Sequence, residues 1–290
     1  MVAEVHSRSW RQFKETLSLL TLALRLKRSR ADLVYKMLGT HNNLAEESLF
    51  LNLGYWEHAT TYDGACTALA RELAKDAHVK DGQAVLDAGC GFGEASAFWS
   101  DTYKLSRLVA LNITESQIEV GRKRWADKKV EFVLGSALDM PFESASFDTI
   151  LALESSFHFP DRVQFFREAL RILKPGGTLA IADFFPLDVK ITIKQRFKEW
   201  LGRGFWQIPQ ANWIGLQKVQ DQLKAIGFKH VSLRDVSPFV FKPFKIFAKD
   251  RIKDPKVSQR LHPLLAKAWG GAHSGLERSQ YVVLIVKKQN

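Results

Sequence analysis

The sequence has few of the features that would place it in several common classes of protein. Its 290 residues contain two cysteines, Cys66 and Cys90, which are too few for a disulfide framework or a cysteine-built metal site. It has no apolar run near the ~20 residues that a membrane span needs, and no apolar signal-peptide core at its start. We therefore expect a cytoplasmic protein with reduced thiols and no bound metal.

The chain also lacks a long tract of a single charge, although its formal net charge is +11. Lysine and arginine are spread along the sequence and are densest at residues 25–30, 122–129 and 242–256. Proteins that bind nucleic acid usually gather basic residues into one patch, so nucleic acid is not the expected partner. The charge leaves open an anionic acceptor or an anionic membrane surface.

The sequence does contain a short apolar strand that leads into an acidic residue and a glycine loop. Residues 84–93 read AVLDAGCGFG, with Asp87 at the end of the apolar run and glycine at 89, 91 and 93. Glycines at a strand-to-helix turn let a ligand lie directly on the main chain. A dinucleotide fingerprint needs glycine at position 94, where this chain has Glu94, so an NAD-dependent oxidoreductase is the less favoured interpretation.

The spacing Asp-x-Gly-x-Gly-x-Gly resembles the first motif of the class I S-adenosylmethionine-dependent methyltransferases. Leu-Lys-Pro-Gly-Gly at 173–177, followed by an apolar strand, extends the resemblance. Leu-Gly-Tyr-Trp at 53–56 resembles the small-molecule subset that includes tocopherol, sugar O- and cyclopropane fatty acid methyltransferases. The resemblance implies an enzyme that uses S-adenosyl-L-methionine. It also implies a Rossmann-like α/β fold, with a seven-stranded, mostly parallel sheet and helices on both faces.

Alternating strand and helix patterns predict that residues 61–290 form the methyltransferase domain. Residues 1–60 are expected to be an N-terminal helical segment that covers the active site, because apolar residues recur at helical intervals within 1–37. The same helix could pair two subunits into a homo-oligomer. The basic, aromatic-rich stretch at about 186–215, after the fifth strand, is expected to form a helical cap that binds the acceptor and excludes water.

The resemblance also implies which residues contact the cofactor: Tyr55, Asp87, Gly89, Gly91, Gly93, Asn112, Ile113, Ser136, Ala137, Leu138 and Leu153. Two positions depart from the family pattern. Asn112 stands where the family usually has an acid that binds the ribose, and Ser136 stands where it has an aspartate that binds adenine. An amide can still accept one hydrogen bond and donate another, so Asn112 remains a candidate ribose contact.

Methyl transfer to a hydroxyl needs alignment of the acceptor and removal of a proton. His158, just beyond the fourth strand, is the candidate general base, and Asp183, at the end of the fifth, is expected to orient its ring. The alternative is that His158 only caps a turn, while Glu154 contacts the cofactor or stabilises a carbocation. We expect a small, partly hydrophobic hydroxyl acceptor. A carbon or amine acceptor, with or without phosphate, and a catalytically silent cofactor-binding partner remain alternatives.

Overall fold

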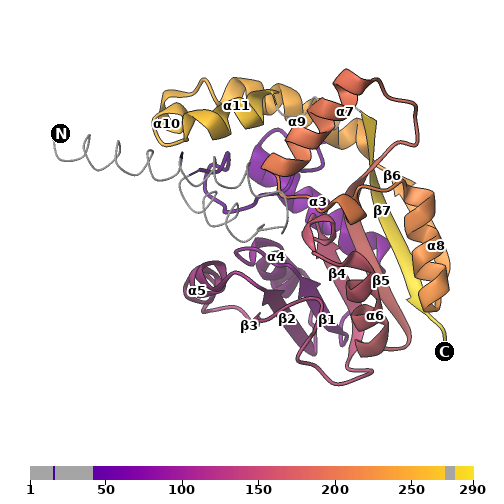
Figure 1. Cartoon of the computed structure of the whole chain (residues 1–290). Coiled ribbons are helices and arrows are strands. Elements are labelled where there is room, and N and C mark those ends of the chain that lie inside the picture. Colours follow the sequence, from indigo (N-terminus) through magenta and orange to yellow (C-terminus); the bar gives the residue numbers. More distant parts are fainter. Residues whose placement is uncertain (1–15, 17–41, 272–277) are drawn as a thin grey trace.

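A computed structural model describes residue 16 and residues 42–271 and 278–290. The described chain forms one seven-stranded sheet in the order β3-β2-β1-β4-β5-β7-β6 (Figure 1). The strands are β1 (Ala84–Ala88), β2 (Arg107–Asn112), β3 (Glu131–Leu134), β4 (Phe147–Leu153), β5 (Leu173–Pro186), β6 (Phe228–Asp235) and β7 (Ser279–Lys288). Only β7 runs antiparallel to its neighbours β5 and β6. The predicted seven-stranded, mostly parallel sheet is confirmed.

Helices cover both faces of this sheet. One face packs against α3 (Tyr62–Asp76), α4 (Glu94–Thr102) and α5 (Glu115–Arg124). The other face packs against α6 (Arg162–Ile172) and α8 (Leu216–Ile226). The strands at the centre of the sheet are covered on both sides, which explains why β1 is buried along its whole length and reads as a continuous apolar run.

The inserted helix after the fifth strand is also present, as α7 (Ile193–Phe205), followed by the short turn η2 (Gln210–Asn212). Further helices precede β7: α9 (Ser237–Arg251), α10 (Pro255–Ser258) and α11 (Pro263–Gly271). The sequence patterns missed α9, which contains Pro243, a residue that normally interrupts helices.

The helix predicted within residues 1–37 lies outside the described residues. In the described ranges, no helix has the length and hydropathy needed to cross a bilayer. The carboxyl ends of β1 and β4 lie side by side where the strand order reverses, because β1 is flanked by β2 and β4. Open α/β sheets bind ligands at this point.

Candidate cofactor and acceptor site

The glycine loop after β1 uses its three glycines in different ways. All three have positive φ, +86° at Gly89, +57° at Gly91 and +81° at Gly93. A Cβ on Gly89 would lie 2.5 Å from Cβ of Ser155, and a Cβ on Gly93 would lie 2.6 Å from the ring of Phe132. A Cβ on Gly91 would meet nothing within 4 Å. Gly89 and Gly93 therefore permit close packing of the protein on itself, whereas Gly91 faces open space.

That open space belongs to a cavity at the carboxyl ends of β1, β2, β3 and β4, with about 1220 Å³ of empty volume including its mouth. Most of the residues predicted from the sequence line it: Asp87, Gly89, Gly91, Asn112, Ile113, Ser136, Ala137, Leu138, Leu153, Glu154 and His158. The lining of the cavity does not include Tyr55, Gly93 or Asp183.

Asp87 ends β1 at the wall of this cavity and is 2% exposed. Its Oδ2 accepts a hydrogen bond of 2.6 Å from the hydroxyl of Ser96 in α4. Burial raises the pKa of Asp87 to about 7, and the hydrogen bond from Ser96 offsets only part of that effect. A cationic ligand group beside this carboxyl would favour its ionised form, so the position suits an ammonium or another positive group.

Replacing Asp87 with asparagine is expected to stabilise the ligand-free protein at alkaline pH. An unfolded aspartate titrates near 4, whereas the folded carboxyl has a pKa of about 7, so the folded state binds more protons between these values. The stabilisation from Asp87 is thus complete in acid and is lost as the pH rises through about 7. At about pH 8, thermal unfolding should show Asp87→Asn to be more stable by on the order of 1 kcal/mol or more. A gain that does not shrink towards about pH 5 would contradict this linkage.

Asn112, at the end of β2, has both amide hydrogens engaged within the protein. Its Nδ2 donates to the carbonyl of Gly91 at 3.1 Å and to Oε1 of Gln117 at 2.7 Å. The sequence-based expectation that this amide would also donate to a ligand is therefore wrong. Its Oδ1, which makes one long contact of 3.4 Å with the N–H of Thr114, is the atom that can accept a ligand hydroxyl.

Gln117, on α5, is a site residue to which the sequence analysis assigned no role. It lines the cavity and is 3% exposed, and its Nε2 donates to no acceptor in the described part of the chain. A buried donor without a partner costs free energy unless a ligand or water supplies an acceptor. At the cavity wall, Gln117 thus has a side-chain donor that no described residue engages. No sequence motif indicates Gln117, and its contact with Asn112 in the structure is what identifies it as a site residue.

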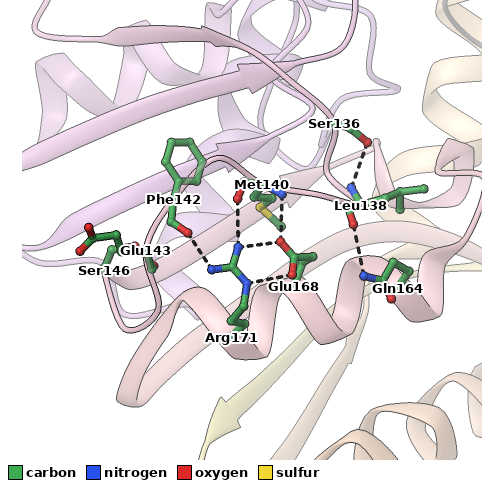
Figure 2. A network of polar contacts seen from close by, with 9 residues as sticks. All are labelled: Ser136, Leu138, Met140, Phe142, Glu143, Ser146, Gln164, Glu168 and Arg171. Atoms are coloured by element: carbon green, nitrogen blue, oxygen red, sulfur yellow. Dashed lines mark hydrogen bonds and ion pairs between the residues drawn. The ribbon is translucent and has the colours of Figure 1, made fainter.

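The segment after β3 forms the cavity wall at which adenine binding was predicted. Ser136, Ala137 and Leu138 all line the cavity. The hydroxyl of Ser136 accepts a hydrogen bond of 3.1 Å from the N–H of Leu138, and Nε2 of Gln164 in α6 donates to the carbonyl of Leu138 at 3.2 Å (Figure 2). Ser136 thus shapes the turn, and contact with a flat ring in this region falls to backbone groups and apolar side chains.

An ion pair on α6 holds the rest of this segment in place. Arg171 pairs with Glu168 at 2.7 Å and donates to the carbonyls of Met140 and Phe142, while Glu168 accepts from the N–H of Met140 (Figure 2). Hydrogen bonds from Arg171 lower the pKa of Glu168, so the pair is ionised at ordinary pH. The wall is therefore fixed by side chains that come from a helix outside the cavity.

Residues 49–52, which precede the core domain in sequence, cover the glycine loop and line the cavity. Two carboxylates fasten this segment. Oε1 of Glu94 accepts from the N–H of Leu49 at 2.9 Å and pairs with Arg124 at 2.8 Å. Oε1 of Glu154 accepts from the N–H of Leu53 at 2.8 Å. These bonds hold residues 49–52 in place at the cavity wall.

Glu154 follows β4 with a φ of +46°, a backbone conformation that is unusual for a residue with a side chain. The hydroxyl of Tyr281 on β7 also donates to its Oε1, at 2.9 Å. Burial raises the pKa of Glu154 to about 8, although the hydrogen bonds from Leu53 and Tyr281 act in the opposite direction. A protonated, uncharged Glu154 is thus a substantial species in the ligand-free protein near neutral pH.

The structure corrects the prediction for Tyr55, which does not line the cavity. Its hydroxyl donates to Oε2 of Glu57 at 2.7 Å, and its ring packs 5.2 Å from that of Phe239 on α9. Burial, together with Glu57, raises the pKa of Tyr55 to about 12. The missed helix α9 explains the error, because it offers Tyr55 an apolar partner outside the cavity.

His158 lies in the short turn η1 (Ser156–His158) after β4, and it lines the cavity. It is 7% exposed. Burial lowers the pKa of His158 to about 3, and a hydrogen bond with the backbone of Gln207 opposes that shift. The imidazole is therefore neutral at ordinary pH, the state in which one ring nitrogen can accept a proton.

Asp183, on β5, is fully buried, and its carboxylate holds the turn that carries His158. Its Oδ2 accepts a hydrogen bond from the hydroxyl of Ser156. Burial raises the pKa of Asp183 to about 7, against the effect of that hydrogen bond and of the nearby charge of Arg162. Within the described residues, no hydrogen bond joins Asp183 to the ring of His158. The predicted direct pairing is not formed there, and Ser156 is instead the residue that joins Asp183 to the turn.

The inserted segment after β5 contacts the site through its last turn. Nδ2 of Asn212 donates to the carbonyls of Phe157 and Phe159, at 2.9 and 2.7 Å. Phe197 and Trp200 of α7 do not line the cavity as expected, and they are 57% and 39% exposed. The segment supports the turn around His158, but its helix faces outward.

Comparison with known proteins identifies relatives of this chain. A family model described as a methyltransferase domain matches residues 86–181. Erythromycin 3''-O-methyltransferase of Saccharopolyspora erythraea is 33% identical over 239 residues, which is 78% of this chain and 77% of the relative. The 27-O-demethylrifamycin SV methyltransferase of Amycolatopsis mediterranei is 33% identical over 197 residues, covering 65% of this chain and 70% of the relative.

Solved structures share the fold at lower sequence identity. The cyclopropane synthase MmaA2 of Mycobacterium tuberculosis superposes with a TM-score of 0.76 at 16% identity, covering 91% of this chain and 98% of that one. The [4+2]-cyclase SpnF superposes with a TM-score of 0.70 at 22% identity, covering 90% of this chain and 98% of that one.

Proposed function

Since the chain belongs to the class I S-adenosylmethionine-dependent methyltransferases of the small-molecule type, we propose that its acceptor atom is a hydroxyl oxygen on a partly hydrophobic metabolite. The observation that carries the choice of oxygen is the 33% identity, over most of both chains, to a protein named for O-methylation of erythromycin. The cavity supports an uncharged, partly apolar acceptor, because no lysine or arginine is among the described residues that line it. A phosphate-bearing acceptor would have no cation to meet there.

The residues of the cavity fit S-adenosylmethionine, the cofactor of this family. Bound there, it supplies an electrophilic methyl group on a sulfonium, whose departing thioether is neutral. Asp87 suits a positive group, the open face of Gly91 admits the ligand to the backbone, and Gln117 has a buried donor that no described residue accepts from. Ala137 and Leu138 give the cavity wall an apolar surface for the base.

His158 is proposed to accept the proton of the acceptor hydroxyl. It lines the cavity and is neutral, so it can take a proton without first losing one. A base with a pKa of about 3 is weak, and an acceptor hydroxyl hydrogen-bonded to it would transfer its proton late, as methyl transfer makes that hydroxyl acidic. Asp183 acts as a positioning residue, through Ser156 and the turn η1.

Two alternatives rest on specific features. Glu154 borders the same cavity, and its ionised form would suit a carbon acceptor by stabilising positive charge on it. A silent cofactor-binding partner would need only the cofactor half of the site. The neutral His158 in the cavity wall favours catalysis over this second possibility.

The proposal predicts methyl transfer from labelled S-adenosylmethionine to hydroxylated natural products. The panel should pair each free alcohol with its methyl ether, and should include an amine and a prenyl compound as competitors. We expect label in the alcohols alone, recovered as an ether. Label in the amine or in a prenyl carbon would overturn the choice of oxygen. Binding of S-adenosylhomocysteine without transfer to any compound of a broad panel would favour the silent partner.

A further inference from the structure

Helix α7 lies at the edge of the molecule (Figure 1), and it carries an apolar stripe that is exposed to solvent. Four large side chains on it are exposed: Ile193 by 89%, Phe197 by 57%, Trp200 by 39% and Leu201 by 50%. At about 100° per residue these positions fall within one face roughly 100° wide. The rings of Phe197 and Trp200 stack with centroids 5.7 Å apart, so the stripe is continuous.

The opposite face of α7 fixes this orientation. Glu199 is 9% exposed, and its Oε1 pairs with Arg278 at 2.8 Å, next to β7. Thr192 and Gln195 form a capping box that fixes the start of the helix. The helix is therefore held with its ionic face inward, and the apolar stripe cannot reach the core without breaking this pair.

Positive charge borders the stripe on both sides. On a helical projection Lys194 and Lys198 follow one edge, and Arg196 lies beyond the other; all three are exposed. The preceding loop carries one exposed residue of each sign, Asp188 and Lys190. The only acidic residue of α7, Glu199, is neutralised by Arg278. The surface thus combines an apolar centre with a cationic rim.

A soluble partner explains this pattern less well than a lipid surface. Large contiguous apolar patches on a monomer usually mark an interaction site. A second copy placed on the stripe by a two-fold axis would bring the cationic rims of the two helices against each other, which is unfavourable. A helix with an apolar face, aromatic side chains and a lysine- and arginine-rich border matches the pattern that lies in the headgroup region of anionic bilayers.

We propose that the outer face of α7 docks this protein on an anionic lipid bilayer. The inference goes beyond the methyl transfer proposed above and does not depend on the acceptor atom. The segment that carries α7 also contacts the cavity, because the backbone of Gln207, just after the helix, bonds to His158. Docking through α7 would hold the inserted segment of the active site at the membrane, where apolar metabolites partition.

The test is flotation of the full chain with vesicles of phosphatidylcholine, with and without phosphatidylglycerol. We expect binding to the anionic vesicles that weakens as salt is added. Phe197→Ser together with Trp200→Ser should lower the affinity on the order of 10-fold or more, because both rings leave the interface. Lys194→Gln together with Lys198→Gln should lower it roughly 30-fold, at about fivefold for each lysine near such a surface.

Leu134→Ser is the matched control. Leu134 is also exposed, by 46%, but it lies on β3 at the opposite edge of the sheet. The Leu134→Ser variant should bind vesicles like the wild type. All variants should unfold at similar temperatures, because the changed side chains are exposed. The proposal is overturned if the wild type does not float, or if the α7 variants float equally well. It is also overturned if the ring variants instead convert a dimer into a monomer on a sizing column, which would assign the stripe to a second copy.

Discussion

Gly91→Val is expected to abolish binding of S-adenosylhomocysteine, with a loss of affinity on the order of 100-fold or more, while the fold is retained. Gly91 faces the cavity, and a Cβ there would meet no protein atom within 4 Å. The valine side chain would therefore occupy ligand space without displacing the protein. Calorimetric titration measures the affinity, and thermal unfolding measures the cost in stability.

The matched control for Gly91→Val is Gly82→Val. Gly82 also has positive φ, +81°, and a Cβ on it would likewise meet no atom within 4 Å, but it lies in an exposed turn before β1. Both substitutions carry a similar backbone strain, of about 1–2 kcal/mol. We expect both proteins to lose similar stability and only Gly91→Val to lose the ligand. If the two variants bound S-adenosylhomocysteine equally well, the proposal that the cofactor binds at the glycine loop would be wrong.

The other glycines of the loop would give a different result. A side chain at Gly89 would collide with Ser155, and one at Gly93 would collide with Phe132. Substitution at either position should therefore unfold or loosen the protein before it affects the ligand alone. For this reason Gly91 is the informative position.

His158→Ala is expected to lower kcat on the order of 100-fold or more, with little change in the affinity for S-adenosylhomocysteine. The substitution removes the proposed proton acceptor. His158→Gln, which keeps a polar side chain of similar size, should lose as much. His230→Ala, at an exposed position on β6, is the control and should retain full activity. If His158→Ala turned over at the wild-type rate, the histidine would serve only to hold the turn and would not act as a base.

The pH dependence of kcat distinguishes His158 from Glu154 as the base. With a pKa of about 3, His158 is already deprotonated at neutral pH, so the rate should stay level from about pH 5 to pH 8 if it acts as the base. With a pKa of about 8, Glu154 would have to lose a proton first, and the rate would rise through about pH 8. A rising profile that disappears in Glu154→Gln would transfer the role to Glu154.

The sequence predicted the sheet, the helices on both faces and the glycine loop correctly. These features depend on local patterns. An apolar run such as 84–86 between helical segments is typical of a buried strand, and glycine at 89 and 91 adopts a positive φ without the strain that a side chain would add. The family motif then located the cavity wall, because the ends of neighbouring parallel strands meet at one edge.

Only the tertiary structure decided which side chains reach the cavity and what they bind. Tyr55 packs on α9, and the hydroxyl of Ser156 donates a hydrogen bond to the carboxylate of Asp183. Gln117 lines the cavity, which no motif indicated. Phe197 on α7 is exposed to solvent, although the aromatic-rich composition of residues 186–215 suggested that this segment binds the acceptor. The contacts of Tyr55 with α9 and of Ser156 with Asp183 join segments that lie apart in the chain. A sequence pattern fixes the face of an element, but the partner that this face meets is set by the packing of the whole fold.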